Sequence, residues 1–151
     1  MAFTTVGKTI PLNVPGGNAF IPTITFGGNS VGVVYTNQEG FLHYPDPGLI
    51  MFHGRIVLSN MGTSTGAVVF RLPAADVAGN TIPLPKLSTI HACEVINQTQ
   101  TPVDQFSCLQ TNASLSVQLF KRVGVTRSAL VETDVGSTFN CYVSGFYFYT
   151  P

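Results

Sequence analysis

Apolar side chains recur at every second position along most of the chain, and this spacing limits the fold more than any other feature of the sequence. Gly48–Asn60 shows the pattern best. One set of alternating positions holds Leu49, Met51, His53, Arg55 and Val57, and the other holds Ile50, Phe52, Gly54, Ile56 and Leu58. A period of two is typical of a β-strand. No long segment repeats its apolar residues with a helical period.

Further segments with this spacing follow along the chain, separated by turns that contain Gly or Pro. They are Ala67–Leu72, Leu87–Asn97, Ala113–Lys121 and Thr138–Thr150. Several short strands with turn signals between them are typical of a β-sandwich or jelly roll. We therefore expect an all-β, antiparallel sandwich or jelly roll. The only segment that can hold a helical turn is Pro73–Asn80.

The N-terminal stretch differs from the rest, because residues 1–38 carry a single charged side chain, Lys8, among many Pro and Gly residues. We expect an extended arm over residues 1–30 and a β-sandwich head over 31–151, with short edge strands at Ala19–Phe26 and Val31–Thr36. The arm either packs along its own domain or docks onto a neighbouring protein. Ordering its backbone costs about 1–2 kcal/mol per residue, which favours a partner surface. The expected docking residues are Phe3, Val6, Ile10, Leu12 and Val14.

Charge is scarce throughout the chain. Charged residues make up 9% of the sequence, against roughly 25% in a typical soluble domain. Seven basic residues balance seven acidic ones, so the chain lacks the positive surplus that binding to nucleic acid requires. No apolar run approaches the roughly 18 residues of a membrane-spanning helix, and we expect no membrane insertion and no secretory signal. A surface so poor in charge indicates an obligate oligomer or a component of a larger assembly.

The last expected strand is apolar on both of its faces. One face carries Phe139, Cys141, Val143, Tyr147 and Tyr149, and the other carries Tyr142, Phe146 and Phe148. One face has to cover the core of the sandwich, so the other needs a second apolar surface. Aromatic side chains are frequent at such interfaces because they bury large areas at low entropic cost. We expect a subunit interface around Ser144–Tyr149, formed by Tyr142, Phe146, Tyr147 and Phe148.

Two segments carry a family resemblance. Residues 40–60, GFLHYPDPGLIMFHGRIVLSN, are followed by a Gly/Thr/Ser-rich turn and a strand that ends at Leu72-Pro73, and residues 143–148 read VSGFYF. This arrangement resembles the head domains of tailed-phage fibres and receptor-binding proteins, and also trimeric capsid decoration proteins with a jelly roll like that of complement C1q and tumour necrosis factor. The likeness covers residues 40–73 and 136–149. It implies a homotrimeric protein on the surface of a bacteriophage virion.

Motifs for catalysis are not found in the sequence. It holds no nucleophile elbow, phosphate-binding loop or dinucleotide fingerprint, and its acidic residues are scattered. His91 and Cys93 are two apart and can share a metal ion, but no third ligand is visible. His53 and Arg55 share a strand face, where they can contact a glycan or an intersubunit carboxylate. We expect no enzyme activity, no cofactor and no metal.

The cysteine content leaves two alternatives open. Cys93, Cys108 and Cys141 are an odd number without a CxxC pair. They form either one disulfide with a third thiol, or three buried thiols as in a protein assembled in a reducing compartment.

The expected function is that of a non-enzymatic phage structural protein, a trimeric head held on the virion surface by its arm and contacting other virion proteins. It belongs either to the capsid, as a decoration protein, or to the tail or its fibres. The alternative is a host-attachment adhesin that recognises a host-surface glycan or protein through loops such as Asn97–Gln105.

Overall fold

The structure, a computed structural model, describes residues 2–5, 8–11, 18–98 and 103–151, with side chains for 18–96 and 103–151. These residues form antiparallel strands and one short 3-10 helix, Glu132–Asp134. The all-β fold class is therefore confirmed. The strands are β1 (Ala2–Thr5), β2 (Lys8–Pro11), β3 (Asn18–Phe20), β4 (Thr23–Phe26), β5 (Val33–Asp46), β6 (Leu49–Met61), β7 (Val68–Arg71), β8 (Thr89–Gln98), β9 (Gln105–Gln110), β10 (Ser116–Val123), β11 (Thr126–Ala129) and β12 (Val135–Phe148).

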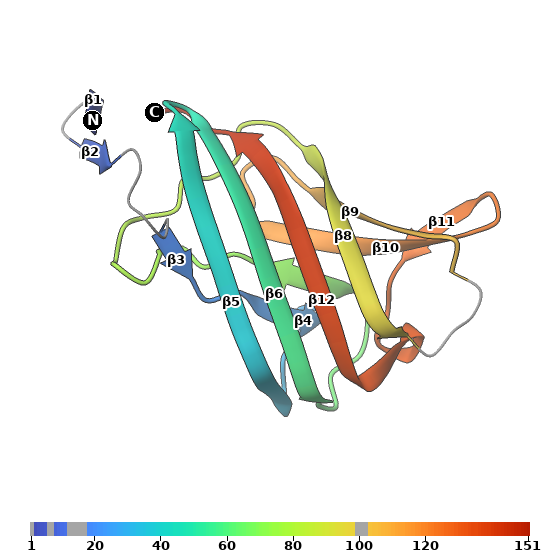
Figure 1. Ribbon diagram of the computed structural model, residues 1–151. Coiled ribbons are helices and arrows are strands. Elements are labelled where there is room, and N and C mark those ends of the chain that lie inside the picture. Colours follow the sequence, from blue (N-terminus) through green and yellow to red (C-terminus); the bar gives the residue numbers. More distant parts are fainter. Residues whose placement is uncertain (1, 6–7, 12–17, 99–102) are drawn as a thin grey trace.

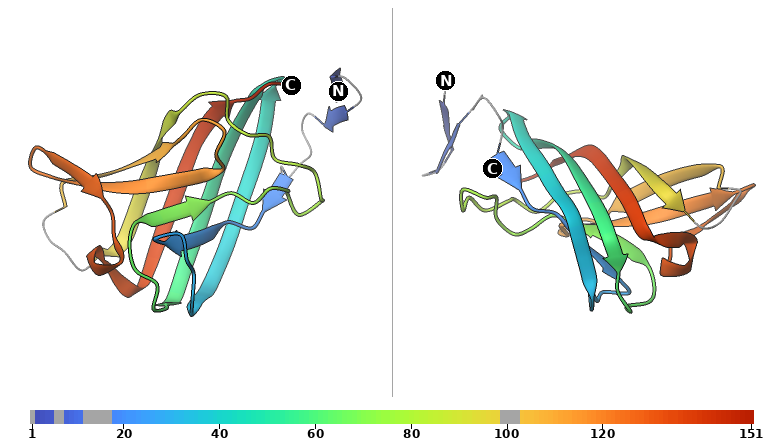
Figure 2. Two further views of the ribbon diagram at one scale, coloured as in Figure 1. Left: turned by 180° about the vertical axis from the view of Figure 1, so that it is seen from behind. Right: turned by 60° about the horizontal axis from the view of Figure 1, so that its bottom comes forward.

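The sheet curls over itself to make the two layers of a sandwich. Its order is β3-β5-β6-β12-β8-β9-β10-β7-β4, and β11 extends β10. The first layer, β3-β5-β6-β12-β8, faces the viewer in Figure 1, and the second lies behind it. Figure 2 shows the second layer from behind, with β10, β7 and β4 crossing the long strands of the first. Strand β8 belongs to both layers, because it pairs with β9 through His91 and with β12 from Ala92 onward.

Alternation of side chains builds the core, as the sequence predicts. On β6, Ile50, Phe52, Ile56 and Leu58 are buried, while Met51 and His53 on the opposite face are exposed. Strand β12 buries its own alternate positions from Phe139 to Tyr147. The period of two therefore gives each long strand of the first layer an inner face toward the core and an outer face toward solvent.

Glycines at the inner face let rings approach the backbone of the first layer. Gly40 and Gly54 are directly paired across β5 and β6. A Cβ atom added at Gly40 would lie 2.4 Å from the Phe20 ring, and one added at Gly54 would lie 2.5 Å from the Phe70 ring. Both rings are fully buried. The two core rings thus pack into the space that a Cβ atom would fill at each glycine.

The sandwich begins earlier than the expected boundary at residue 30. Strand β3 extends the first layer by pairing with β5, and β4 extends the second by pairing with β7. Phe20, Ile24 and Phe26 are 0% exposed. These residues were expected in the arm, but they supply core side chains, so the head starts at Asn18.

The expected arm is described only in part. Strands β1 and β2 pair with each other and form a sheet separate from the sandwich. Phe3 lies opposite Ile10 in that hairpin. Val6, Leu12 and Val14 lie outside the described residues, so their expected docking role stays a prediction.

One local expectation was wrong, and another was confirmed with different bounds. Pro73–Asn80 contains no helical turn. Instead the Asp76 carboxylate accepts hydrogen bonds from the backbone N–H of Asn80 at 2.8 Å and from its side-chain amide at 2.9 Å, which closes a loop. The strand expected at Val31–Thr36 is part of β5, which continues through Gly40 to Asp46. Gly40 lies inside this strand, and the Phe20 ring packs over it in the space that a side chain would fill.

Two truncations test the revised boundary. Removing residues 2–11 takes away only the separate hairpin, so we expect the free energy of unfolding to stay unchanged. Removing residues 2–26 also deletes three buried side chains, each worth about 3–5 kcal/mol, which together exceed the stability of many domains. We expect that protein not to fold. Circular dichroism and urea titration measure both outcomes, and a cooperatively folding 27–151 fragment would contradict the boundary.

Gly54→Ala tests the packing of rings over glycine. The new methyl group would enter the space of the buried Phe70 ring, so we expect a loss of about 1–3 kcal/mol in the free energy of unfolding. Adding Phe70→Leu should recover part of this loss. Ser59→Ala, at an exposed position of the same strand, is the matched control and should change stability by less than about 0.5 kcal/mol. A neutral Gly54→Ala result would refute the close contact.

Candidate functional site

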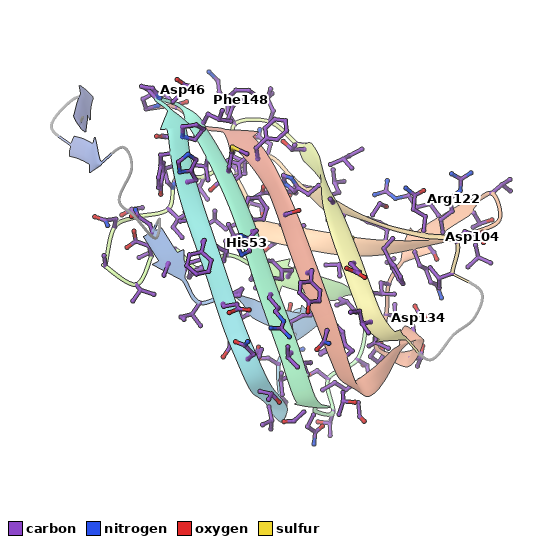
Figure 3. All side chains as sticks on the ribbon, viewed as in Figure 1. Asp46, His53, Asp104, Arg122, Asp134 and Phe148 are labelled. Carbon is purple, nitrogen blue, oxygen red and sulfur yellow. The ribbon has the colours of Figure 1, made fainter. Side chains whose placement is uncertain are left out.

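The outer face of β5, β6, β12 and β8 is the candidate site, and we call it the outer face. Strand register arranges its side chains in rows that run across the strands. Figure 3 shows His53 near the middle of this face, while Phe148 and Asp46 lie near one end of the strands. From that end, a row with Met51 and Phe146 comes first, a row with Phe41, His53 and Ser144 follows, and a row of charged side chains comes after it.

The apolar end carries large side chains that no part of the described chain covers. Met51 lies opposite both His43 on β5 and Phe146 on β12. Met51 and Phe146 are 47% and 48% exposed, and Phe148 is 51% exposed. The rings of Phe146 and Phe148 contact each other edge to face, with their centroids 6.1 Å apart. Ile90 on β8 is also exposed.

A shallow groove occupies the middle of the outer face. Phe41, His53 and Ser144 lie side by side across β5, β6 and β12, and the Phe41 and His53 rings are 5.2 Å apart. The groove has a volume of about 600 Å³. Its lining also includes Met51 and Phe146. Among the lining side chains, only the histidines His43 and His53 are ionisable. It therefore offers aromatic and neutral polar contacts together.

The next row is charged. An Arg55 guanidinium nitrogen, Nη1, donates to the Glu39 carboxylate at 3.3 Å, and the guanidinium lies 5.3 Å from the centre of the Tyr142 ring. Glu94 lies opposite Tyr142 on the other side. The buried Nε of Arg55 has no hydrogen-bond partner within the described part of the chain. The row places charges of both signs on the outer face, where a binding partner can contact them.

The four residues expected at a subunit interface do not share one face. Phe146 and Phe148 are exposed on the outer face, and Tyr142 is half-buried there. Tyr147 points the opposite way and is 0% exposed, and its hydroxyl donates to the Pro83 carbonyl oxygen at 2.9 Å. Tyr147 is a core residue because odd-numbered positions of β12 face inward, so it does not belong to the outer face.

The groove has a buried histidine beneath its floor. His91 is 4% exposed and packs under Gly145, where an added Cβ would lie 2.0 Å from the ring nitrogen Nδ1. Its Nε2 bonds to the Gln110 side-chain oxygen at 2.9 Å, and the Gln110 amide donates to the Ser114 carbonyl oxygen. Since Gln110 accepts from His91, neutral His91 carries its proton on Nε2. Nδ1 is left without a partner among the described residues, and burial lowers the pKa of His91.

His91 and Cys93 do not form a metal centre with other groups. They lie on the same face of β8, as expected, but His91 bonds to Gln110 and the Cys93 thiol contacts Cys108. Across residues 18–96 and 103–151, no group of three or more His, Cys, Asp or Glu side chains is placed to hold a metal ion.

The basic residues near Gly124 lie far from the outer face, on the β10–β11 hairpin, and they interact with nearby groups. Lys121 forms an ion pair with the buried carboxylate of Asp134. Arg122 donates to the Gly124 carbonyl oxygen at 2.9 Å, and Arg127 stacks on Phe120 at 4.0 Å. Figure 3 shows Arg122 and Asp104 close together at this end of the molecule. The cluster is a hairpin stabilised by its own neighbours.

Some residues of the outer face were not expected from the sequence. Met51 was placed on the correct face of its strand, but only the pairing of β6 with β12 brings it beside Phe146. Phe41 lies outside the segment expected to be strand. The loop Asn97–Gln105, expected to serve an adhesin, is only partly described, and its last residue begins β9.

Comparisons with protein-family models, curated protein sequences and solved structures find no match to this chain. In the parts of the chain that the structure describes, no helix is long and apolar enough to cross a membrane.

Acid titration tests the environment of His91. Folding holds the pKa of His91 below the usual value of about 6.5. In acid, the unfolded chain therefore binds a proton at His91 more readily than the folded chain does. This contribution is absent above about pH 6.5 and lowers stability as the pH falls below it. The slope reaches at most about 1.4 kcal/mol per pH unit.

We expect wild type to lose more unfolding free energy than His91→Gln between pH 7.5 and pH 5, measured by urea titration. The substitution leaves every other side chain in place, so the difference between the two proteins isolates His91. Parallel stability curves would show that His91 is not held neutral by the fold.

Proposed function

We propose that this chain is a non-enzymatic assembly protein that packs against further copies of itself through the outer face. The observation that carries the proposal is the row of half-exposed Met51 and Phe146, with Phe148 beside it, on one regular sheet surface. Contiguous exposed apolar residues of this size mark interaction surfaces in soluble proteins. Aromatic residues and Met are also enriched in the cores of protein interfaces.

The charged row supports a defined geometry for this assembly. Glu39, Arg55 and Glu94 cross the face near the middle of their strands, two residues beyond the row of Phe41, His53 and Ser144. Charges beside an apolar patch fix the register of two surfaces, because mismatched charges are penalised. The Arg55 side chain is 35% exposed, so its guanidinium remains accessible to a carboxylate or carbonyl oxygen of a neighbouring subunit.

The kind of assembly proposed is a homotrimer on the surface of a phage virion. This part of the proposal rests on the resemblance of residues 40–73 and 136–149 to fibre heads and decoration proteins. The low charge supports this proposal, and so does the N-terminal pair of strands β1 and β2, which forms a sheet separate from the sandwich.

The groove supports the second candidate, a receptor-binding adhesin. Phe41 and Phe146 border neutral polar groups at His53 and Ser144, a combination that suits an uncharged sugar stacked on a ring. An adhesin of this kind requires the outer face to stay open to solvent. A monomer that binds neutral glycans would therefore favour the adhesin over self-assembly.

Phe146→Asp tests the assembly proposal. Wild type should elute as a species of about three times the 16.1 kDa chain mass in size-exclusion chromatography with light scattering. The variant should elute with the mass of one chain, because a charge buried without a partner in the interface is costly. Its circular dichroism should match wild type, since Phe146 is exposed within the single chain.

Val125→Asp is the matched control. Val125 is 93% exposed at the tip of the β10–β11 hairpin, away from the outer face, so this variant should assemble normally. The proposal fails if wild type is a monomer at micromolar concentrations, or if Phe146→Asp assembles as well as Val125→Asp does.

A further inference from the structure

Three neighbouring strands bring the cysteines of the chain together behind the outer face. Cys93 lies on β8, Cys108 on β9 and Cys141 on β12. His91 pairs directly with Cys108, and Cys93 is two residues along the same face of β8, so Cys93 and Cys108 are diagonal neighbours. The Cys108 thiol donates to the His91 carbonyl oxygen at 3.2 Å, and its sulfur lies within hydrogen-bonding reach of the Cys93 thiol.

The surroundings of the thiols differ. Cys93 is half-buried, whereas Cys108 and Cys141 are 0% exposed. The hydrogen bond from Cys108 lowers the pKa of Cys93, and the guanidinium of Arg127 acts in the same direction against the effect of burial. The same hydrogen bond and burial raise the pKa of Cys108, and burial raises the pKa of Cys141. A half-exposed thiol next to a second thiol, with its own pKa lowered, is a typical setting of a reactive cysteine.

We propose that Cys93 and Cys108 form a thiol–disulfide exchange site, in which Cys93 attacks a low-molecular-weight disulfide and Cys108 resolves the product. The Cys93 thiolate forms a bond to one sulfur of the reagent, whose disulfide bond breaks and releases one thiol. The Cys108 sulfur then loses its proton and attacks the Cys93 sulfur, which releases the second thiol. The reagent gains two electrons and two protons, and the cysteines become a disulfide.

The bond forms at the junction of the two layers. Pairing of β8 with β9 ends at His91, and from Ala92 onward β8 pairs with β12. Diagonal neighbours in a sheet lie at the upper end of the span that a disulfide bridges. Closing the bond therefore draws Cys93 toward β9 just past the last β8–β9 pair, while β8 stays paired with β12 on its other side. A link at this point ties the sandwich together, so the oxidised form should melt at a higher temperature than the reduced form.

Oxidised glutathione is the probe for this site. The full-length, reduced protein is incubated with it, then unfolded and alkylated, and its peptides are analysed by mass spectrometry. Wild type should lose two of its three thiols, with Cys93 joined to Cys108 and Cys141 alkylated. Cys108→Ala should instead keep a stable glutathione adduct on Cys93, because the resolving thiol is missing. Cys141→Ala should react as wild type does.

Three results would overturn the proposal. One is a wild-type protein that keeps all three thiols, and another is a stable adduct on Cys93 when Cys108 is present. The third is a disulfide that involves Cys141. Circular dichroism of each variant confirms folding before the reaction. Cys93→Ala removes the attacking thiol, and Cys108→Ala removes the resolving thiol. If one of these variants does not fold, the other still tests its own step of the exchange.

Discussion

The packing of rings against glycine in the first layer is the contact on which the rest of the molecule depends. Phe20 and Phe70 fill the space over Gly40 and Gly54, and the His91 ring fills the space over Gly145. Each ring lies within the core and closes the two layers onto each other. The rings fill the inner side of the long strands. The side chains at the alternate positions of these strands therefore lie on the outer face.

This arrangement explains the two-sided apolar character of β12. Its inner residues, from Phe139 to Tyr147, are buried by the second layer. Its outer residues, Phe146 and Phe148, have no such cover among the described residues and remain half exposed. A chain with 9% charged residues that leaves aromatic rings on a flat sheet has a surface suited to contact with another protein. Self-assembly through this face accounts for both features.

Much of this architecture could be predicted from the alternation of side chains. The inner and outer faces of β6 and the burial of Val117 and Leu119 on β10 follow from a period of two. The alternation does not say which strands pair, and so it could not place Met51 beside Phe146. It also gives no sign that the Phe20 ring from β3 packs over Gly40, inside the long strand β5. Residues 18–26 were expected to form edge strands within an arm, yet the buried side chains of Phe20, Ile24 and Phe26 place them in the core.

Site-specific photo-crosslinking tests most directly whether the outer face joins copies of the chain. Benzoylphenylalanine replaces Met51 in one protein and Val125 in another, and both are irradiated at micromolar concentration. Assembly through the outer face predicts covalent dimers and trimers from position 51, with crosslinks mapping to outer-face residues of a second copy, and only single chains from position 125. Single chains from both positions, or crosslinks from position 125 alone, would contradict it.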